Sequence, residues 1–193
     1  MMKGDGEPFG FRYSYRDFLW CLVIVFIAMA YIIPPKPPKA AAPNQGDVVI
    51  TMHWDRAANA DVDLWVKSPE SLPVGYSHMT GKWCDLVRDD LGRYMDPSSR
   101  NEEMTVCRRA PGGEWIVDAM LYRIYKGQPP IRVTVVARSL IGGRYRVIAR
   151  RSFVLDWQGQ QKTAFRFSLT KSGELVPGSI NRLPAKLYSM GTP

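Results

Sequence analysis

The stretch Ile131 to Leu155, IRVTVVARSLIGGRYRVIARRSFVL, decides the fold class of this chain. Val133, Val135 and Ala137 fall on one side of an extended chain, which is the two-residue period of a half-buried β-strand. Gly142-Gly143 then interrupts the pattern, and two glycines between β-rich segments predict a tight hairpin. We therefore expect two antiparallel strands, over 131–138 and 145–155.

Five further segments share this content of branched and aromatic residues and the lack of helical periodicity. They are Val48 to Trp54, Asp63 to Val66, Met104 to Arg108, Glu114 to Tyr122 and Thr163 to Leu169. Seven short strands at this spacing, with no convincing helix among them, are typical of an antiparallel β-sandwich of Ig-like or jelly-roll type.

An apolar run, Phe18 to Ile33, precedes this β-rich region. Extended back to Tyr13 it gives 21 residues, enough for a helix that crosses a bilayer core of about 30 Å. Ala40 to Ala42 resemble a signal-peptide cleavage site, but Pro43 follows them, so we expect an uncleaved anchor. The expected organisation is a cytoplasmic segment 1–12, a transmembrane helix 13–33, a stiff Pro-rich linker 34–46, a periplasmic β-sandwich 47–171 and a C-terminal tail 172–193.

Asp17 lies at the start of this apolar run. Its short side chain cannot reach water as easily as the neighbouring Arg16, so the carboxylate would lie in a layer of low dielectric constant. Ionisable groups in such positions commonly carry ions. The alternative is that Asp17 only caps the helix start, where the helix dipole favours an anion.

The helix also resembles a known family. Tyr15, Asp17 and Phe18, followed by Phe26 and Met29, are similar to the membrane helix of MotB-type subunits of the ExbD/TolR/MotB superfamily. The resemblance implies an ion-driven motor or stator subunit of the bacterial inner membrane, a homodimer inside a ring of MotA-type subunits. Asp17 would be the proton-carrying carboxylate, with sodium as the alternative ion, and the β-sandwich would couple torque to an envelope target.

The remaining chain departs from that family, because prolines in the linker prevent a plug helix and no peptidoglycan-binding domain follows. The second hypothesis is therefore a membrane-anchored periplasmic binding module for a protein or a glycan, without ion transport. The motifs G-x-S-x-G, H-E-x-x-H and the P-loop do not occur, so we do not expect an enzyme.

Cysteine positions bear on the compartment. Cys84 and Cys107 both fall in the β-rich region, and in an oxidising space they could form a disulfide. The alternative is two unrelated buried thiols. Cys21, in the expected membrane helix, is interpreted as a small apolar packing residue.

The β-rich region carries acidic residues in short motifs. Asp61-Val62-Asp63-Leu64-Trp65-Val66, an acidic loop with Gly92 and the segment Gly113 to Val117 resemble YfaP-like uncharacterised secreted β-sandwich modules. Carboxylates are the ligands that calcium prefers, and solvated turn residues are the alternative interpretation. The candidate calcium ligands are Asp61, Asp63, Asp89, Asp90 and Glu102.

The net charge of +8 is concentrated in the predicted hairpin, which holds six arginines between residues 131 and 152 and no acid. Such a patch can meet lipid headgroups, cell-wall polymer or an acidic partner. A charged edge strand that discourages aggregation explains it equally well. Nucleic acid is not an expected partner, because the domain is expected in the periplasm.

Overall fold

The computed structural model describes residues 11–32, 47–92 and 100–188. The chain divides into two compact units, Met1–Ala42 and Pro43–Pro193, and each is described here by itself. The expected cytoplasmic residues 1–10 and the Pro-rich linker 34–46 lie outside the described ranges.

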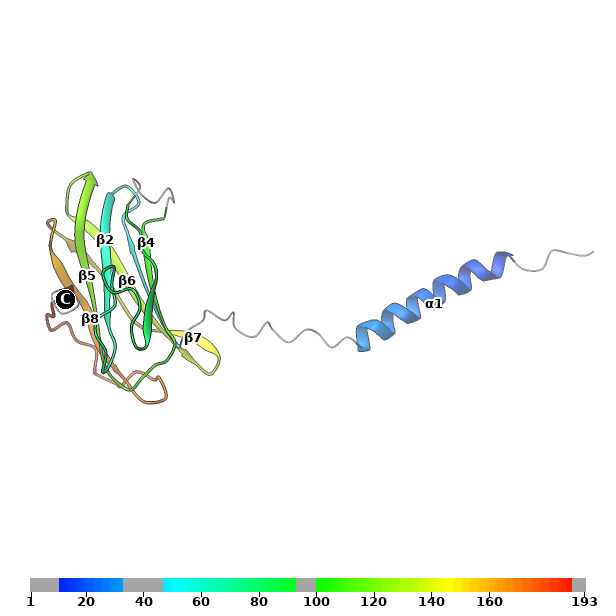
Figure 1. Cartoon of the computed structure of the whole chain (residues 1–193). Helices are drawn as coiled ribbons and strands as arrows, with labels where there is room; N and C mark the ends of the chain where they lie inside the picture. Colours follow the sequence, from blue (N-terminus) through cyan, green and yellow to red (C-terminus); the bar gives the residue numbers. More distant parts are fainter. Residues whose placement is uncertain (1–10, 33–46, 93–99, 189–193) are drawn as a thin grey trace, which may run out of the picture. The chain divides into compact units, whose positions relative to one another are not determined.

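The second unit is an all-β domain of two antiparallel sheets (Figure 1). Five strands form one sheet, in the order β3-β4-β1-β6-β7, and three form the other, in the order β2-β5-β8. The strands are β1 Val48–Trp54, β2 Asn59–Lys67, β3 Cys84–Arg88, β4 Glu102–Cys107, β5 Gly113–Lys126, β6 Ile131–Ile141, β7 Arg144–Leu155 and β8 Gln161–Leu169.

The core lies between the two sheets and follows the alternation along each strand. Ile50 and Met52 of β1 and Val133 and Val135 of β6 are fully buried, as the two-residue period of a strand requires. Trp115 is also fully buried in this core, and its ring stacks on that of Phe167 with centroids 6.0 Å apart. The hairpin from β6 to β7 forms around Gly142 and Gly143, both at positive φ.

Each open edge of the sandwich is closed by a charged side chain that crosses between the sheets. At one edge, Glu103 of β4 accepts a hydrogen bond of 2.6 Å from the backbone N–H of Leu64 in β2. At the other edge, Arg151 of β7 donates to the carbonyl oxygens of Thr163 and Ala164 in β8, at 2.7 and 3.0 Å. These contacts satisfy backbone groups that a strand edge would otherwise leave unpaired.

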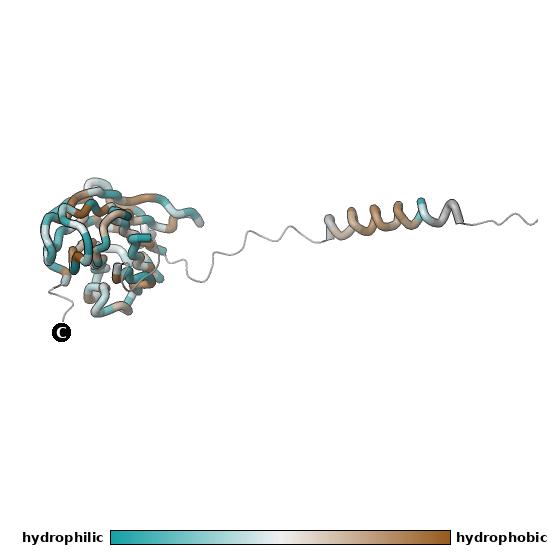
Figure 2. The backbone as a smooth tube through the Cα atoms, turned by 90° about the horizontal axis from the view of Figure 1, so that it is seen from above, coloured by the Kyte–Doolittle hydropathy of each residue, from teal (hydrophilic) through white to brown (hydrophobic). Residues whose placement is uncertain are grey.

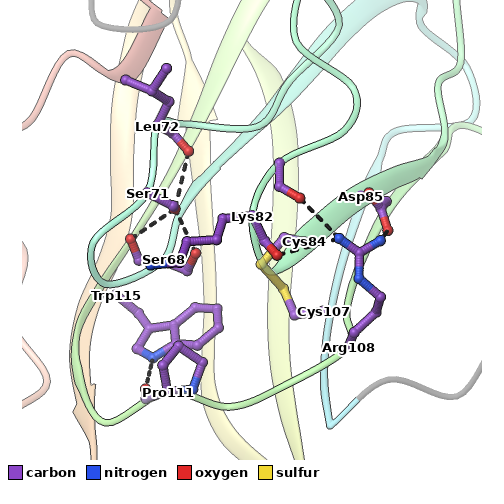
Figure 3. Close-up of a disulfide and its surroundings, with 11 residues drawn as sticks. Ser68, Ser71, Leu72, Lys82, Cys84, Asp85, Cys107, Arg108, Pro111 and Trp115 are labelled. Atoms are coloured by element: carbon purple, nitrogen blue, oxygen red, sulfur yellow. Dashed lines mark hydrogen bonds and ion pairs between the residues drawn. A yellow bond between two sulfur atoms is a disulfide. The ribbon is translucent and has the colours of Figure 1, made fainter.

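Strand β3 is short, and we did not expect it from the sequence. It pairs with β4, and Cys84 and Cys107 face each other in this pair and form a disulfide. Arg108 lies beside the disulfide, where it pairs with Asp85 and donates to the carbonyl oxygen of Gly81 (Figure 3). The disulfide therefore fixes an edge strand that has only one neighbour.

Removing this disulfide should lower the stability of the domain. The double substitution Cys84→Ser and Cys107→Ser opens a loop with a sequence separation of 23 residues, which should cost about 3 kcal/mol of unfolding free energy. Urea unfolding of both proteins without reductant measures the difference. An equal loss in the wild type on adding reductant is the control, and equal stability of the two proteins would contradict the prediction.

Residues 172–188, expected as a tail, first pair with the edge strand β8 and then pack on the outer face of the smaller sheet. Asn181 and Leu175 form bridges with β8, and Leu187 is fully buried against Trp65 and Ile116. The backbone N–H of Leu187 donates to the buried carboxylate of Asp118 at 3.2 Å. The C-terminal segment thus covers apolar residues that the outer face of an uncovered sheet would expose.

The first unit contains the helix α1, Phe11–Ile32, and here the expected transmembrane helix is wrong. Among the described residues, no helix combines the length and the apolar character that crossing a bilayer requires. The reason is the charged pair Arg16 and Asp17, because the uncharged part of α1 that follows them rises only about 22 Å up to Ile32, against about 30 Å of hydrocarbon. Figure 2 shows the hydrophobic residues along α1, and Phe18 and Phe26 are exposed.

Candidate metal centre

Strand β2 presents two carboxylates on the face of its sheet that points away from the core. Val62 and Leu64 face the core, so the alternating residues Asp61 and Asp63 face outward. Both aspartates are nevertheless buried, with exposed fractions of 3% and 2%. Two acids at this depth need charged or hydrogen-bonding partners, because burial of an unpaired charge is costly.

Glu103 brings a third carboxylate to the same place from the other sheet. It lies in β4, opposite Met52 of β1, and is completely buried. Its Oε2 atom accepts the hydrogen bond from Leu64 N–H. One oxygen each of Asp61, Asp63 and Glu103 lie within 4.8 Å of one another. These three residues are named the acidic triad below.

The segment that follows β3 borders the acidic triad. Asp90 is buried and uses both oxygens locally, accepting from Gly92 N–H at 3.0 Å and from Glu102 N–H at 3.1 Å. Gly92 has a φ of +78°, and a Cβ there would lie 3.1 Å from the ring of Tyr125. A glycine is therefore required for this segment to lie against β5, which brings Asp89 to the triad.

Four carboxylate oxygens of this site have no hydrogen-bond partner among the described residues. They are buried atoms: Asp61 Oδ1, Asp63 Oδ2, Asp89 Oδ1 and Glu103 Oε1. Buried polar atoms in native proteins almost always have partners. Four unpartnered acceptors gathered in one place need a proton or a cation between them.

The acids raise one another's pKa. Burial raises the pKa of Asp63 to about 8, with Asp61 and Asp89 adding their negative charges. Burial, with Asp89 and Asp90, raises the pKa of Asp61 to about 7, against the opposing effect of Arg123. Burial and the charge of Asp63 also raise the pKa of Glu103 well above its ordinary value. The cluster therefore accepts positive charge near neutral pH.

The donor set consists of oxygen atoms, without histidine or cysteine. Hard cations such as calcium and magnesium prefer carboxylate oxygens, whereas zinc favours nitrogen and sulfur ligands. Two oxygens that bind one calcium ion at about 2.4 Å lie at most about 4.8 Å apart, and the oxygens of the triad do not exceed this separation. The acidic triad can therefore hold a metal ion.

Of the expected ligands, the structure brings Asp61 and Asp63 together. Asp89 and Asp90 lie close enough for their charges to raise the pKa of Asp61. Glu102 instead faces the opposite side of β4, where its Oε1 lies 3.9 Å from His53 Nε2. Neighbouring residues of a strand point to opposite faces, so the glutamate in the site is Glu103. Both acids occur in the sequence Asn101-Glu102-Glu103, and only the register of β4 decides which of them faces the site.

The residues expected to form the ion-carrying helix lie on α1. Asp17 is exposed, and so are Tyr15, Phe18, Phe26 and Met29. Cys21 is an exposed free thiol. No described contact bears on an ion-carrying role of Asp17, so the motor function, its homodimer and its ring of MotA-type subunits stay predictions.

Comparisons with protein-family models, curated proteins and solved structures find no significant match to this chain. The resemblances to MotB-type helices and to YfaP-like modules therefore stay predictions. The class of the domain, an all-β antiparallel two-sheet fold with a buried acidic triad, comes from the structure itself.

Proposed function

We propose that the β-sandwich is a calcium-binding module in which the ion joins the two sheets at one open edge. The acidic triad supplies the ligands, two from β2 and one from β4. The observation that carries the proposal is the group of four buried carboxylate oxygens without partners. Calcium fits better than magnesium, because magnesium dehydrates reluctantly and usually keeps several waters.

The position of the site favours a structural ion. Asp61, Asp63 and Glu103 are almost completely buried, so a partner molecule has little access to an ion between them. The ion would instead hold β2, β4 and the segment after β3 together. This is the role of a calcium ion that stabilises a binding module and shapes its surface, and the proposal includes no catalytic step.

The compartment follows from two features. A disulfide between Cys84 and Cys107 favours an oxidising space, since thiols stay reduced in the cytosol. Calcium sites of moderate affinity are filled in extracellular fluids, where such modules bind calcium with Kd values of about 0.1 to 1 mM. We therefore propose that the domain binds its partner, a protein or a glycan, in the periplasm or outside the cell.

Direct measurement of calcium binding tests the proposal. Isothermal titration of the full chain at pH 7 should show one calcium ion per chain, with release of protons, because Asp61 and Asp63 have pKa values raised to about 7 and 8. Titrations in two buffers of different ionisation enthalpy count the protons. Magnesium should bind at least tenfold more weakly.

Matched variants locate the ion. Glu103→Gln should abolish calcium binding, whereas Glu102→Gln, one residue away on the other face of β4, should leave the affinity unchanged. Circular dichroism establishes that both variants are folded. Unchanged calcium binding in Glu103→Gln would overturn the proposal. So would the absence of binding to the wild type at about 10 mM calcium, a concentration about tenfold above the Kd of the weakest such sites.

A further inference from the structure

A second candidate site lies at the end of the sandwich that carries the disulfide. A cavity of about 410 Å³ opens there, within the size range of small-molecule sites. Loops from both sheets meet around it, and its lining includes Asp47, Trp83, Arg109, Pro111, Leu140 and Lys171. Asp47 precedes β1 and Trp83 precedes β3, while Lys171 follows β8.

The cationic side chains of this cavity are uncompensated. Neither Arg109 nor Lys171 has an ion-pair or hydrogen-bond partner for its side chain within the described part of the chain. Both are exposed, so their charged groups are available to a ligand. Asp47 is the acid in the lining, which leaves a formal charge of +1 and matches a ligand with one negative charge.

The remaining lining combines apolar side chains with the hydroxyl of Ser172, and one of its walls is held in shape. Trp83, Leu140 and Pro111 supply an apolar surface suited to an aromatic or aliphatic ligand body. One wall is fixed by a hydrogen bond of 2.8 Å from Ser139 Oγ to the carbonyl oxygen of Gly173. Gly173 has a φ of +80°, and a Cβ there would lie 3.3 Å from Ala110, so this wall is built around a glycine.

We infer that this cavity binds a small organic carboxylate, with Arg109 and Lys171 holding the anion and Trp83 contacting the apolar body. Two formal cations against one acid favour a monoanion over a phosphate monoester, which carries about two charges at neutral pH. The same chemistry describes a free acid and the terminal carboxylate of a peptide. The inference is independent of the calcium site, because the two sites share no residue.

Binding of 3-phenylpropionate to the full chain tests the inference, with 3-phenylpropionamide as the neutral probe of equal shape. The readout is the indole N–H signal of Trp83 in nitrogen–proton correlation spectra, assigned with the Trp83→Phe variant. We expect the carboxylate to shift this signal and to bind at least tenfold more tightly than the amide. Acetyl-Ala-Phe with a free carboxylate distinguishes the two sources of the ligand. Tighter binding of this peptide than of 3-phenylpropionate indicates a peptide terminus, and weaker binding indicates a free acid.

Variants that remove a cation or the acid of the cavity should change the affinity for the carboxylate in opposite directions. Arg109→Gln should weaken carboxylate binding about tenfold, as the loss of a charged hydrogen bond does, and Lys171→Gln should weaken it severalfold. Asp47→Asn should strengthen it, and Arg144→Gln, an exposed arginine outside the cavity, should leave it unchanged. Equal binding of acid and amide, no shift with either probe, or equal effects of Arg109→Gln and Arg144→Gln would overturn the inference. The affinity for the carboxylate should be the same in the presence of calcium and in the presence of a chelator.

Discussion

The unfolding free energy of the calcium-free protein should fall by about 4 kcal/mol or more as the pH rises from 5 to 8. In the folded state the pKa of Asp61 is raised to about 7 and that of Asp63 to about 8, from 3.8. The folded state therefore holds more protons than the unfolded state in this window, so stability is full below about pH 4 and is lost as the pH rises. One extra proton across three pH units corresponds to about 4 kcal/mol.

Urea unfolding in chelator at several pH values measures this slope. The control is the same series in saturating calcium, where the ion replaces the protons of the triad. The fall should then shrink to about 1.4 kcal/mol, the share of Asp118, whose burial raises its pKa to about 6. A hydrogen bond from Lys162 lowers the pKa of Asp156, so this residue affects the unfolding free energy only at more acidic pH. A stability that is constant or rises between pH 5 and 8 in chelator would show that the acidic triad is not held protonated.

Asp63→Asn should change stability in opposite directions with and without calcium. In chelator at pH 8 the variant removes one of several clustered negative charges, so it should be about 1 to 2 kcal/mol more stable than the wild type. In calcium at about 100 to 1,000 times the Kd, the wild type should gain about 3 to 4 kcal/mol. The variant loses a ligand and most of this gain, so it becomes the less stable protein.

Thermal and urea unfolding under the two conditions measure the reversal. Asp156→Asn is the matched control, because this exposed aspartate pairs with Lys162, and its replacement should change the unfolding free energy little and equally in both conditions. If Asp63→Asn were destabilising by the same amount in calcium and in chelator, Asp63 would have a packing role and would not bind the ion.

Much of the sheet structure could be read from alternation. The stretch 131–155 predicts β6, β7 and the hairpin at Gly142-Gly143, and the structure has them at Ile131–Ile141 and Arg144–Leu155. Strand β2 was harder, because the structure buries both of its faces. Only Asp63 to Val66 was predicted for it, so Asn59 to Val62 and Lys67 were missed.

Strand β3 was missed for a related reason. It is five residues long, CDLVR, and two of the five are charged, so it carries too few apolar positions for the period to show. Its place is set by contacts that are distant in sequence, namely the pairing with β4 and the disulfide to Cys107.

The sequence by itself determined the antiparallel β-sheets of the domain, since the two-residue period in segments such as 131–155 is local. It also supplied the acids Asp61 and Asp63 as candidate metal ligands. Only the tertiary structure decided that Glu103, and not Glu102, completes the site, because the register of β4 against β1 selects which side chain crosses to β2. The same holds for the cavity at the disulfide end, whose walls come from loops more than 100 residues apart.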